Sequence, residues 1–277
     1  MSFRLWPDGP HRDKPGFGSI GEAIGGIRYI TGEAGSPAVR PNISLGDSVA
    51  GLYAVVGALM ATHARDVQGS GVGQVVDVAL YEAVFSLMES PLPEYDIAGI
   101  VRECAGTSLP GISPSNTYRS SDGSYIVIGG NSDAIFRRLM KAIGRPDMAD
   151  DSHYRTNADR AAHADELDNL IENWTSKQPL QEILRILDEA QVPAGPIYSI
   201  ADIMNDPQYR MRDMILQSTI EGIGSVAMPG LIPKLSETPG EVKGYGGAPG
   251  TDNEEIYVER LGLSEHELNR LAAEGAI

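Results

Sequence analysis

Residues 44–79 read SLGDSVAGLYAVVGALMATHARDVQGSGVGQVVDVA and contain the clearest structural pattern in the chain. Apolar side chains over 47–64 recur at helical spacing on one broad face, which predicts a helix with Asp47 at its N-terminus. A glycine-rich turn then leads into a β-branched run at 74–79, which is typical of a strand, and a further helix is expected over 80–88. Helix, strand and helix in this order predict part of an α/β layer.

The segments on either side of this stretch predict smaller elements. Apolar residues at helical spacing favour a short amphipathic helix over 20–27. The many Pro and Gly residues of 91–111 predict a linker and a flexible loop. Asp122-Gly123 is a common signal of a tight hairpin, so an α+β unit is expected to begin near Pro114. Helices are expected at 132–143, 163–174 and 179–190 and after a capping box at 264–267, strands at 214–220 and 225–229, and a return segment from 192–200.

Composition and charge narrow the classes of function. The 277 residues are 42% hydrophobic, enough for a well-buried core, and their net charge of −16 opposes contact with nucleic acid or an anionic membrane. No run reaches the roughly 18 consecutive apolar residues of a membrane span, and the N-terminus lacks the apolar stretch of a signal peptide, so a cytoplasmic protein is expected. Cys104 is the only cysteine and the five histidines show no paired ligand spacing, so neither an internal disulfide nor a metal site is expected.

Two motifs have competing interpretations from the residues alone. Asp47 is either a functional carboxylate or an ordinary helix N-cap, because Asp is among the favoured capping residues. Residues 16–21 match the GxGxxG pattern of a dinucleotide-binding turn, but the charged residues 11–15 before them, which end in a proline, cannot form the buried strand that this turn requires. A nicotinamide cofactor is therefore not expected.

Several separated segments resemble CoA-transferase family III, the CaiB/BaiF family, and occur in the same order. Residues 45–51 resemble the G-D-x-x-x-G site of the family, and residues 69–78 closely resemble its TGxGQxVDVSL strand. The other matching segments are Gly9-Pro10, residues 12–17, Gly25-Gly26, Thr31-Gly32, Thr156-Asn157 with Arg160, residues 192–196 and residues 275–277. The resemblance covers essentially the whole chain.

The resemblance implies an α/β fold with part of a Rossmann-like large domain and a smaller α+β domain. We expect a partial large domain at 1–92, a linker and glycine loop at 93–112, the small α+β domain at 113–200 and a return segment to the large domain at 201–277. Relatives begin with a longer N-terminal segment and form interlocked dimers. This chain is therefore expected to lack that segment and to form a homodimer or bind a second subunit, with the apolar faces of 20–27 and 47–64 exposed.

The resemblance also implies the chemistry of the site. Asp47 stands at the position of the family's acyl-accepting aspartate, which forms an anhydride with the acyl group and then a thioester with CoA. The implied reaction moves CoA from an acyl-CoA donor, such as succinyl-CoA, to a small carboxylic acid, with the CoA thioester as a substrate and no permanently bound cofactor. Arg12 and Lys14 are candidates for binding the CoA phosphates. Gly106 and Gly111 mark a candidate lid over the intermediates, or else an ordinary interdomain linker.

Two other functions remain open. A racemase subgroup of the superfamily has a His where Phe17 stands, and because Phe17 cannot exchange a proton, racemisation is less favoured than transfer. A catalytically silent partner subunit or fragment is the second alternative, because this chain is expected to lack the N-terminal segment of its relatives.

Overall fold

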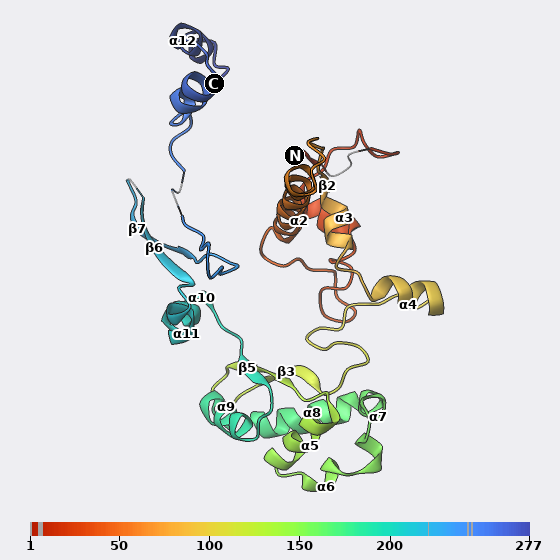
Figure 1. The fold of residues 1–277 in the computed structure, drawn as a ribbon. Coiled ribbons are helices and arrows are strands. Elements are labelled where there is room, and N and C mark those ends of the chain that lie inside the picture. Colours follow the sequence, from red (N-terminus) through yellow and green to blue (C-terminus); the bar gives the residue numbers. More distant parts are fainter. Residues whose placement is uncertain (1, 5–7, 221, 243, 245) are drawn as a thin grey trace. The chain divides into compact units, whose positions relative to one another are not determined.

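The computed structural model describes residues 2–4, 8–220, 222–242, 244 and 246–277. The chain contains both helices and short strands, so the fold is mixed α/β as predicted (Figure 1). The chain divides into two compact units, one extending to Ile197 and the other comprising Tyr198–Ile277, and each is described by itself. Within the first unit we call the residues up to 112 the N-terminal part and residues 113–197 the α+β part; the predicted division into domains stays a prediction.

The N-terminal part is built around one long helix. Its elements are β1 (Ser2–Arg4), α1 (Gly18–Ile24), α2 (Leu45–Thr62), a π-helical turn (His63–Val67), β2 (Asp77–Ala79), α3 (Leu80–Phe85) and α4 (Pro91–Ala98). Helix α2 contacts α1, α3 and β2, and β2 pairs in parallel with β1 (Figure 1). Only the last three residues of the strand predicted at 74–79 form β2, because the partner strand β1 is itself three residues long.

The helices of this part approach one another through small residues. A Cβ atom on Gly25, the residue that ends α1, would lie 2.6 Å from Cβ of the fully buried Val84 on α3. Ala50 and Ala54 are the buried alanines of α2. Because none of these residues carries a large side chain, the three helix backbones can pack at short range.

The broad apolar face of α2 is exposed, as are Ile20 and Ile24 of α1. Leu52, Leu59 and Met60 are each more than 60% exposed, which agrees with the exposure expected for these two faces. Leu45–Val67 is also long and apolar enough to cross a membrane by length and composition, with 17% of its most apolar window buried. Length and composition are weak evidence for a span, since core helices of soluble proteins pass the same test.

Residues 91–98 of the segment predicted as a linker and flexible loop form a helix, so the loop prediction is wrong there, while the linker role stays a prediction. Helix α4 begins at Pro91, where the missing N–H of proline breaks no helical hydrogen bond. It ends at Gly99, whose φ of 66° is the left-handed conformation that closes many helices. The Pro and Gly residues of this segment were interpreted as loop formers, but here they mark the two ends of a helix.

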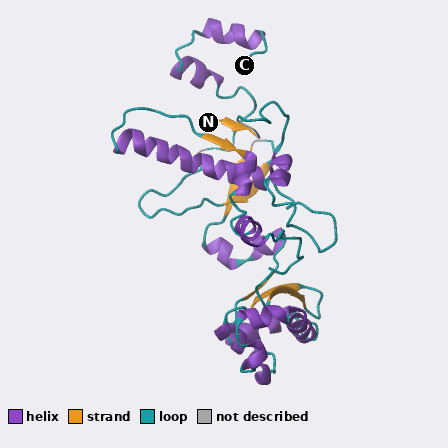
Figure 2. Ribbon diagram, turned by 90° about the vertical axis from the view of Figure 1, so that its right-hand side faces the viewer, coloured by secondary structure: helices purple, strands orange, loops and turns teal. Residues whose placement is uncertain are grey.

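The α+β part has a three-stranded antiparallel sheet with helices packed on one face (Figure 2). The strands are β3 (Ser115–Arg119), β4 (Tyr125–Gly129) and β5 (Ala194–Pro196), and the helices are α5 (Asp133–Ala142), α6 (Pro146–Ala149), a 3₁₀ turn (Ser152–Tyr154), α7 (Asn157–Ala162), α8 (Ala164–Thr175) and α9 (Leu180–Glu189). The hairpin at Asp122-Gly123 and the helices predicted as α5, α8 and α9 are confirmed. Residues 194–196 add the third strand beside β4, within the range predicted for the small α+β domain.

Alternate residues of β4 divide the sheet into a buried and an exposed face. Ile126 and Ile128 are fully buried against helix residues such as Phe136 and Ile171, whereas Tyr125 and Val127 are about half exposed. This period of two is the pattern of a strand with one face on a core. The α+β part therefore encloses a hydrophobic core of its own.

Arg160 on α7 is a fully buried cation within this part. Its guanidinium donates hydrogen bonds to the backbone carbonyls of Ser113, Asn131 and Tyr154 and to the carboxylate of Asp133. These carbonyls belong to three separate loops. One side chain therefore connects the segment before β3, the segment after β4 and the segment before α7.

The second unit contains one hairpin and short helices. Its elements are α10 (Ile200–Asn205), α11 (Pro207–Met211), β6 (Ile215–Ile220), β7 (Gly224–Pro229), a π-helical segment (Glu254–Arg260) and α12 (Glu265–Ala273). Strands β6 and β7 pair antiparallel, as the two predicted strands suggested. The hydroxyl of Ser264 accepts a hydrogen bond from the N–H of Glu267 and caps α12.

We predict that Arg160→Met destabilises the α+β part by about 3 kcal/mol, because interior carbonyls lose their donor. Urea unfolding followed by the fluorescence of Trp174, which packs against this core, measures the change. Arg185→Met removes an exposed arginine paired with Glu182 and Glu189, and it should leave the unfolding midpoint nearly unchanged. Equal midpoints for the Arg160 and Arg185 variants would contradict this role of Arg160.

Candidate active site

Asp47 is the third residue of helix α2. Ser44 is the N-cap, so the interpretation of Asp47 as the capping residue is wrong. The Asp47 side chain is exposed, and within the described part of the chain its carboxylate makes no hydrogen bond or ion pair. The first turn of a helix favours a negative charge, because the free N–H groups and the helix dipole are positive there. Asp47 is thus an accessible carboxylate that no hydrogen bond or ion pair from the described residues occupies.

Gly18, the first residue of α1, lies directly against this carboxylate. A Cβ atom on Gly18 would lie 2.3 Å from Oδ2 and 2.8 Å from Cγ of Asp47, far inside van der Waals contact. Only glycine at this position leaves Asp47 in its present conformation. Residues 8–17, which lead into α1, form turns and bends, so Gly18 and Gly21 of the GxGxxG match serve helix packing instead of a dinucleotide turn.

A second carboxylate, Glu22, is buried beside the same turn of α2. Only 1% of Glu22 is exposed, and its Oε1 accepts a hydrogen bond of 3.4 Å from the backbone N–H of Gly46, the residue before Asp47. Its Oε2 accepts hydrogen bonds from Nη2 and Nε of Arg28 at 3.3 and 3.4 Å. Glu22 is therefore held on both sides, by a backbone donor and by a cation.

The candidate phosphate-binding residues lie just before α1. Arg12 and Lys14 are both exposed, and Nε of Arg12 lies 3.5 Å from the carboxylate of Asp13. Across the described ranges, no hydrogen bond or ion pair joins either side chain to Asp47. Phe17 is the N-cap residue of α1, next to Gly18 in the chain, and is 81% exposed.

The loop that contains Gly106 and Gly111 is fixed at both ends. At its start, the N–H of Gly106 donates a hydrogen bond of 2.9 Å to the carbonyl of Gly32. At its end, the amide group of Asn157 donates to the carbonyl of Gly111 at 2.7 Å and accepts from the N–H of Ser113 at 3.2 Å. Both glycines have positive φ, 63° and 80°, which other residues rarely adopt. Residues 107–110 lie between these anchors.

The start of this loop is also connected to the segment after α1. The Tyr29 hydroxyl donates a hydrogen bond of 2.7 Å to the carboxylate of Glu103, which raises the pKa of the Tyr29 phenol. The thiol of Cys104 donates to the backbone carbonyl of Tyr29. The loop therefore begins at the same segment, residues 29–32, that leads from α1 towards α2.

Glu22 and Arg28 were not predicted from the sequence, and Asn157 was identified only as part of the matching segment Thr156-Asn157. Glu22 lies on the face of α1 opposite Ile20 and Ile24, where periodicity predicts an exposed residue. The structure reverses this expectation, because the face with Gly18 and Glu22 packs against α2 while the isoleucines are exposed. The glycines spaced along that face, at 18, 21 and 25, were the available signal for close packing.

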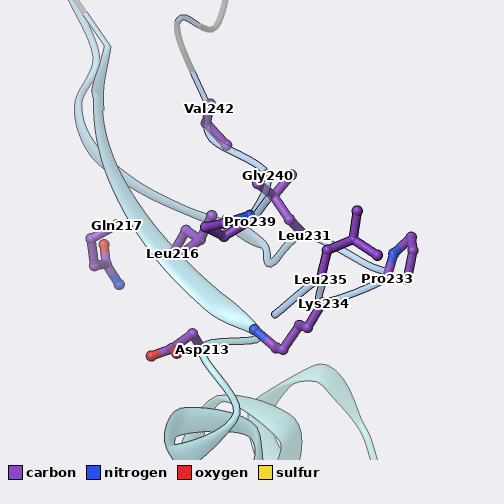
Figure 3. A pocket seen from close by; sticks show the side chains of 10 residues that line it. All are labelled: Asp213, Leu216, Gln217, Leu231, Pro233, Lys234, Leu235, Pro239, Gly240 and Val242. Carbon is purple, nitrogen blue, oxygen red and sulfur yellow. The ribbon is translucent and has the colours of Figure 1, made fainter. Parts of the chain in front are cut away.

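Two hollows in the surface contain none of the predicted site residues. A hollow of about 540 Å³ in the second unit lies beside β6, with Asp213 and Lys234 among its lining residues (Figure 3). An apolar hollow of about 330 Å³ in the N-terminal part lies between the end of α1 and α4, lined by residues that include Gly26, Met88 and Tyr95. Among the described residues no cluster of His, Cys, Asp and Glu has the arrangement of a metal site.

Comparison with known proteins decides the family. The model of CoA-transferase family III matches residues 2–253. The chain belongs to CoA-transferase family III. The resemblance deduced from the separated motifs is thereby confirmed.

Curated members of family III resemble the chain along nearly its whole length. Succinyl-CoA–D-citramalate CoA-transferase of Chloroflexus aurantiacus is 46% identical over 269 residues, which are 97% of this chain and 66% of the relative. The beta subunit of succinyl-CoA–L-malate CoA-transferase from the same organism is 35% identical, with coverages of 97% and 67%. Formyl-CoA:oxalate CoA-transferase of Streptomyces avermitilis is 30% identical, with coverages of 100% and 70%. The chain thus spans about two thirds of the length of these relatives.

Solved structures support the same fold. A crystal structure of a CaiB/BaiF family protein from Brucella suis matches with a TM-score of 0.76 and 26% identity, covering 93% of this chain and 66% of that one. A protein of Mycobacterium tuberculosis matches with a TM-score of 0.73 at 20% identity, covering 86% of this chain and 62% of that one, which shows the fold alone. The predicted α/β fold of family III is therefore confirmed.

We predict that Gly18→Ala lowers CoA transfer by the active assembly about 10- to 100-fold, because the new methyl group forces the Asp47 carboxylate to rotate away. The fold should survive, since the carboxylate is the free end of an exposed side chain. Gly129→Ala is the control, because a Cβ there meets only the carbonyl oxygen of Pro193 at 3.8 Å, an ordinary van der Waals contact, and Gly129 lies in β4 outside the candidate site. Steady-state assays with succinyl-CoA, beside circular dichroism, measure both effects; wild-type transfer by Gly18→Ala would refute the steric argument.

Proposed function

We propose that this chain carries the acyl-accepting carboxylate of a CoA-transferase that moves CoA from succinyl-CoA to another organic acid, with Asp47 as the nucleophile. The observation that supports this role most is the state of Asp47, an exposed carboxylate in the first turn of α2 that has no partner among the described residues. The named activities of the family III relatives support the donor and the reaction type.

The proposed reaction begins with attack of an Asp47 carboxylate oxygen on the thioester carbon of succinyl-CoA. The C–S bond breaks, CoA leaves as a thiolate, and a mixed anhydride forms. The thiolate then attacks the Asp47 carbonyl carbon, which releases succinate and leaves an aspartyl-CoA thioester. Each nucleophile is already an anion, so neither step needs a general base.

The acceptor acid completes the cycle by the reverse steps. Its carboxylate attacks the aspartyl-CoA thioester, CoA leaves again as a thiolate, and a second anhydride forms between the acceptor and Asp47. The thiolate attacks the acceptor carbonyl, which makes the new acyl-CoA and restores the Asp47 carboxylate. One exchange between two acids is thereby divided into easier steps.

The acceptor is proposed to be a small dicarboxylic acid. The relatives at 46% and 35% identity are named for D-citramalate and L-malate, which are both 2-hydroxy dicarboxylic acids. The formyl-CoA:oxalate relative, at 30% identity, also has a dicarboxylic acid in its name. Citramalate and malate are therefore the first acceptors to test.

Residues 106–111 are proposed to shield the intermediates from water, because an anhydride or a thioester that meets water loses the acyl group. The two anchored ends, at Gly106 and Gly111, leave a short span between them that includes Leu109, whose side chain is about half exposed. An interdomain linker would need no such anchoring to both Gly32 and Asn157. This contrast favours the lid over the linker.

Arg12 and Lys14 are proposed to bind the phosphates of CoA. Both side chains are exposed, and they lie on the turn that leads to Phe17 and Gly18 beside Asp47. Among the described residues, the Arg12 side chain contacts the carboxylate of the exposed Asp13 alone, at 3.5 Å, and a phosphate can replace this contact.

The assembly is proposed to be a homodimer or a complex with a second subunit, in the cytoplasm. The exposed apolar faces of α1 and α2 are consistent with such an association. The succinyl-CoA–L-malate relatives are named as alpha and beta subunits. A catalytically silent partner subunit remains the alternative, and the racemase is disfavoured by the aromatic ring of Phe17.

We predict that Asp47→Asn lowers transfer on the order of 10³-fold or more, because the amide is a far weaker nucleophile. Asp96→Asn changes another exposed carboxylate, on α4, and should retain activity. In the wild type, succinyl-CoA followed by hydroxylamine should leave a hydroxamate on the peptide that contains Asp47, as read by mass spectrometry. Transfer by Asp47→Asn, or turnover without any modified Asp47, would overturn the proposed function.

We predict that Asn157→Ala raises the ratio of succinyl-CoA hydrolysis to CoA transfer roughly threefold or more, because the end of the loop is released. Asn205→Ala removes a comparable side-chain bond to a backbone carbonyl in the second unit and is the control. Free CoA and the acyl-CoA product are measured in the same reaction. An unchanged ratio would favour the linker over the lid.

A further inference from the structure

Helix α2 begins without the usual side-chain cap. The first N–H groups of a helix have no partner within it, and the N-cap normally supplies one. Ser44 stands at the N-cap, but across the described residues its side chain makes no capping hydrogen bond. Gly46 is buried, so its N–H cannot turn to water for a partner.

Glu22, on α1, supplies the hydrogen-bond acceptor that the N-cap of α2 does not. Its Oε1 accepts from the N–H of Gly46 at 3.4 Å, across 24 positions of sequence. The bond holds the backbone one residue before Asp47. A change in the position of the Gly46 peptide must therefore move the nucleophile.

Gly18 and Glu22 act from the same face of α1, because residues four apart lie one above the other on a helix. Gly18 contacts the side chain of Asp47, and Glu22 holds the backbone beside it. A Cβ on Gly46 would lie 3.3 Å from the carbonyl oxygen of Gly18 and 3.4 Å from Cγ of Glu22. The first turn of α2, which carries Asp47, thus contacts α1 at both Gly18 and Glu22.

The burial of a charge at this point is not needed to pack two helices. Replacing a buried ion pair with apolar residues is often neutral or stabilising, so a hydrophobic side chain in place of Glu22 would serve packing alone. Arg28 balances the buried carboxylate, and its own side chain is 27% exposed. The ion pair between Glu22 and Arg28 thus keeps a hydrogen-bond acceptor, Oε1 of Glu22, buried between α1 and α2.

We infer that Glu22 is a positioning residue for CoA transfer, which fixes the first turn of α2 through the N–H of Gly46 and thereby orients Asp47. The inference rests on the proposed function of Asp47. Its contribution belongs to the attack steps and not to the binding of succinyl-CoA, because Glu22 is buried behind the backbone that it holds.

Three substitutions test separately the length, the charge and the size of the Glu22 side chain. Glu22→Gln keeps an acceptor oxygen at the same distance, Glu22→Asp keeps the charge but shortens the side chain, and Glu22→Leu removes the acceptor at similar size. Glu22→Asp and Glu22→Leu are expected to lower kcat for transfer about tenfold or more, with KM for succinyl-CoA within about twofold of the wild type, whereas Glu22→Gln stays within about threefold in kcat. Glu89→Leu, an exposed glutamate after α3, is the control.

The assays use the active assembly, with circular dichroism and urea unfolding as checks on folding. If Glu22→Leu does not fold, the comparison of Glu22→Asp with Glu22→Gln decides, because both keep a polar side chain. The rate at which succinyl-CoA and hydroxylamine modify Asp47 should fall in parallel with kcat.

Wild-type kcat in Glu22→Asp, or a loss in Glu22→Gln as large as in Glu22→Asp, overturns the inference. If the inference about Glu22 fails while Asp47→Asn is inactive, the proposed function still stands. If Asp47→Asn is active, the proposed function itself is overturned.

Discussion

The contact between α1 and the first turn of α2 is the interaction on which the candidate site depends. Gly18 and Gly46 allow it, because a side chain at either position would meet the neighbouring helix at 2.3 to 3.3 Å. The contact exposes the Asp47 carboxylate while burying the peptide that precedes it. Asp47 is thus held through its backbone, which leaves its carboxylate oxygens accessible for the proposed reaction.

The two parts of the first unit differ in how they bury apolar side chains. The α+β part closes its own core around residues such as Ile126, Leu139 and Ile171, with Arg160 joining its loops. In the N-terminal part, small residues bury one side of α2 while Leu59 and its neighbours stay exposed. A surface that apolar is rarely left in water, which supports the proposed association through this part of the protein and not through the α+β part.

The sequence predicted well what is local and poorly what depends on distant contacts. Amphipathic helices such as α5, α8 and α9 and the hairpin at Asp122-Gly123 follow from short-range patterns, and the structure has them. Asp47 was located by the resemblance of its motif, while its local sequence favoured an N-cap that Ser44 in fact occupies. Glu22 could not be found from periodicity, because its hydrogen-bond donor lies 24 residues away and its helix packs with the polar face inward.

The environments of the two carboxylates distinguish their roles. Glu22 is 1% exposed, and both of its oxygens accept hydrogen bonds, one from Gly46 and the other from Arg28, so attack on a thioester would require breaking an ion pair in the interior. Asp47 lies in the adjacent turn, where its side chain is exposed and its oxygens accept no hydrogen bond from the described residues. Under the proposed function, burial and hydrogen bonding separate two side chains of the same chemistry into a holder, Glu22, and a nucleophile, Asp47, as in other enzymes that use paired carboxylates.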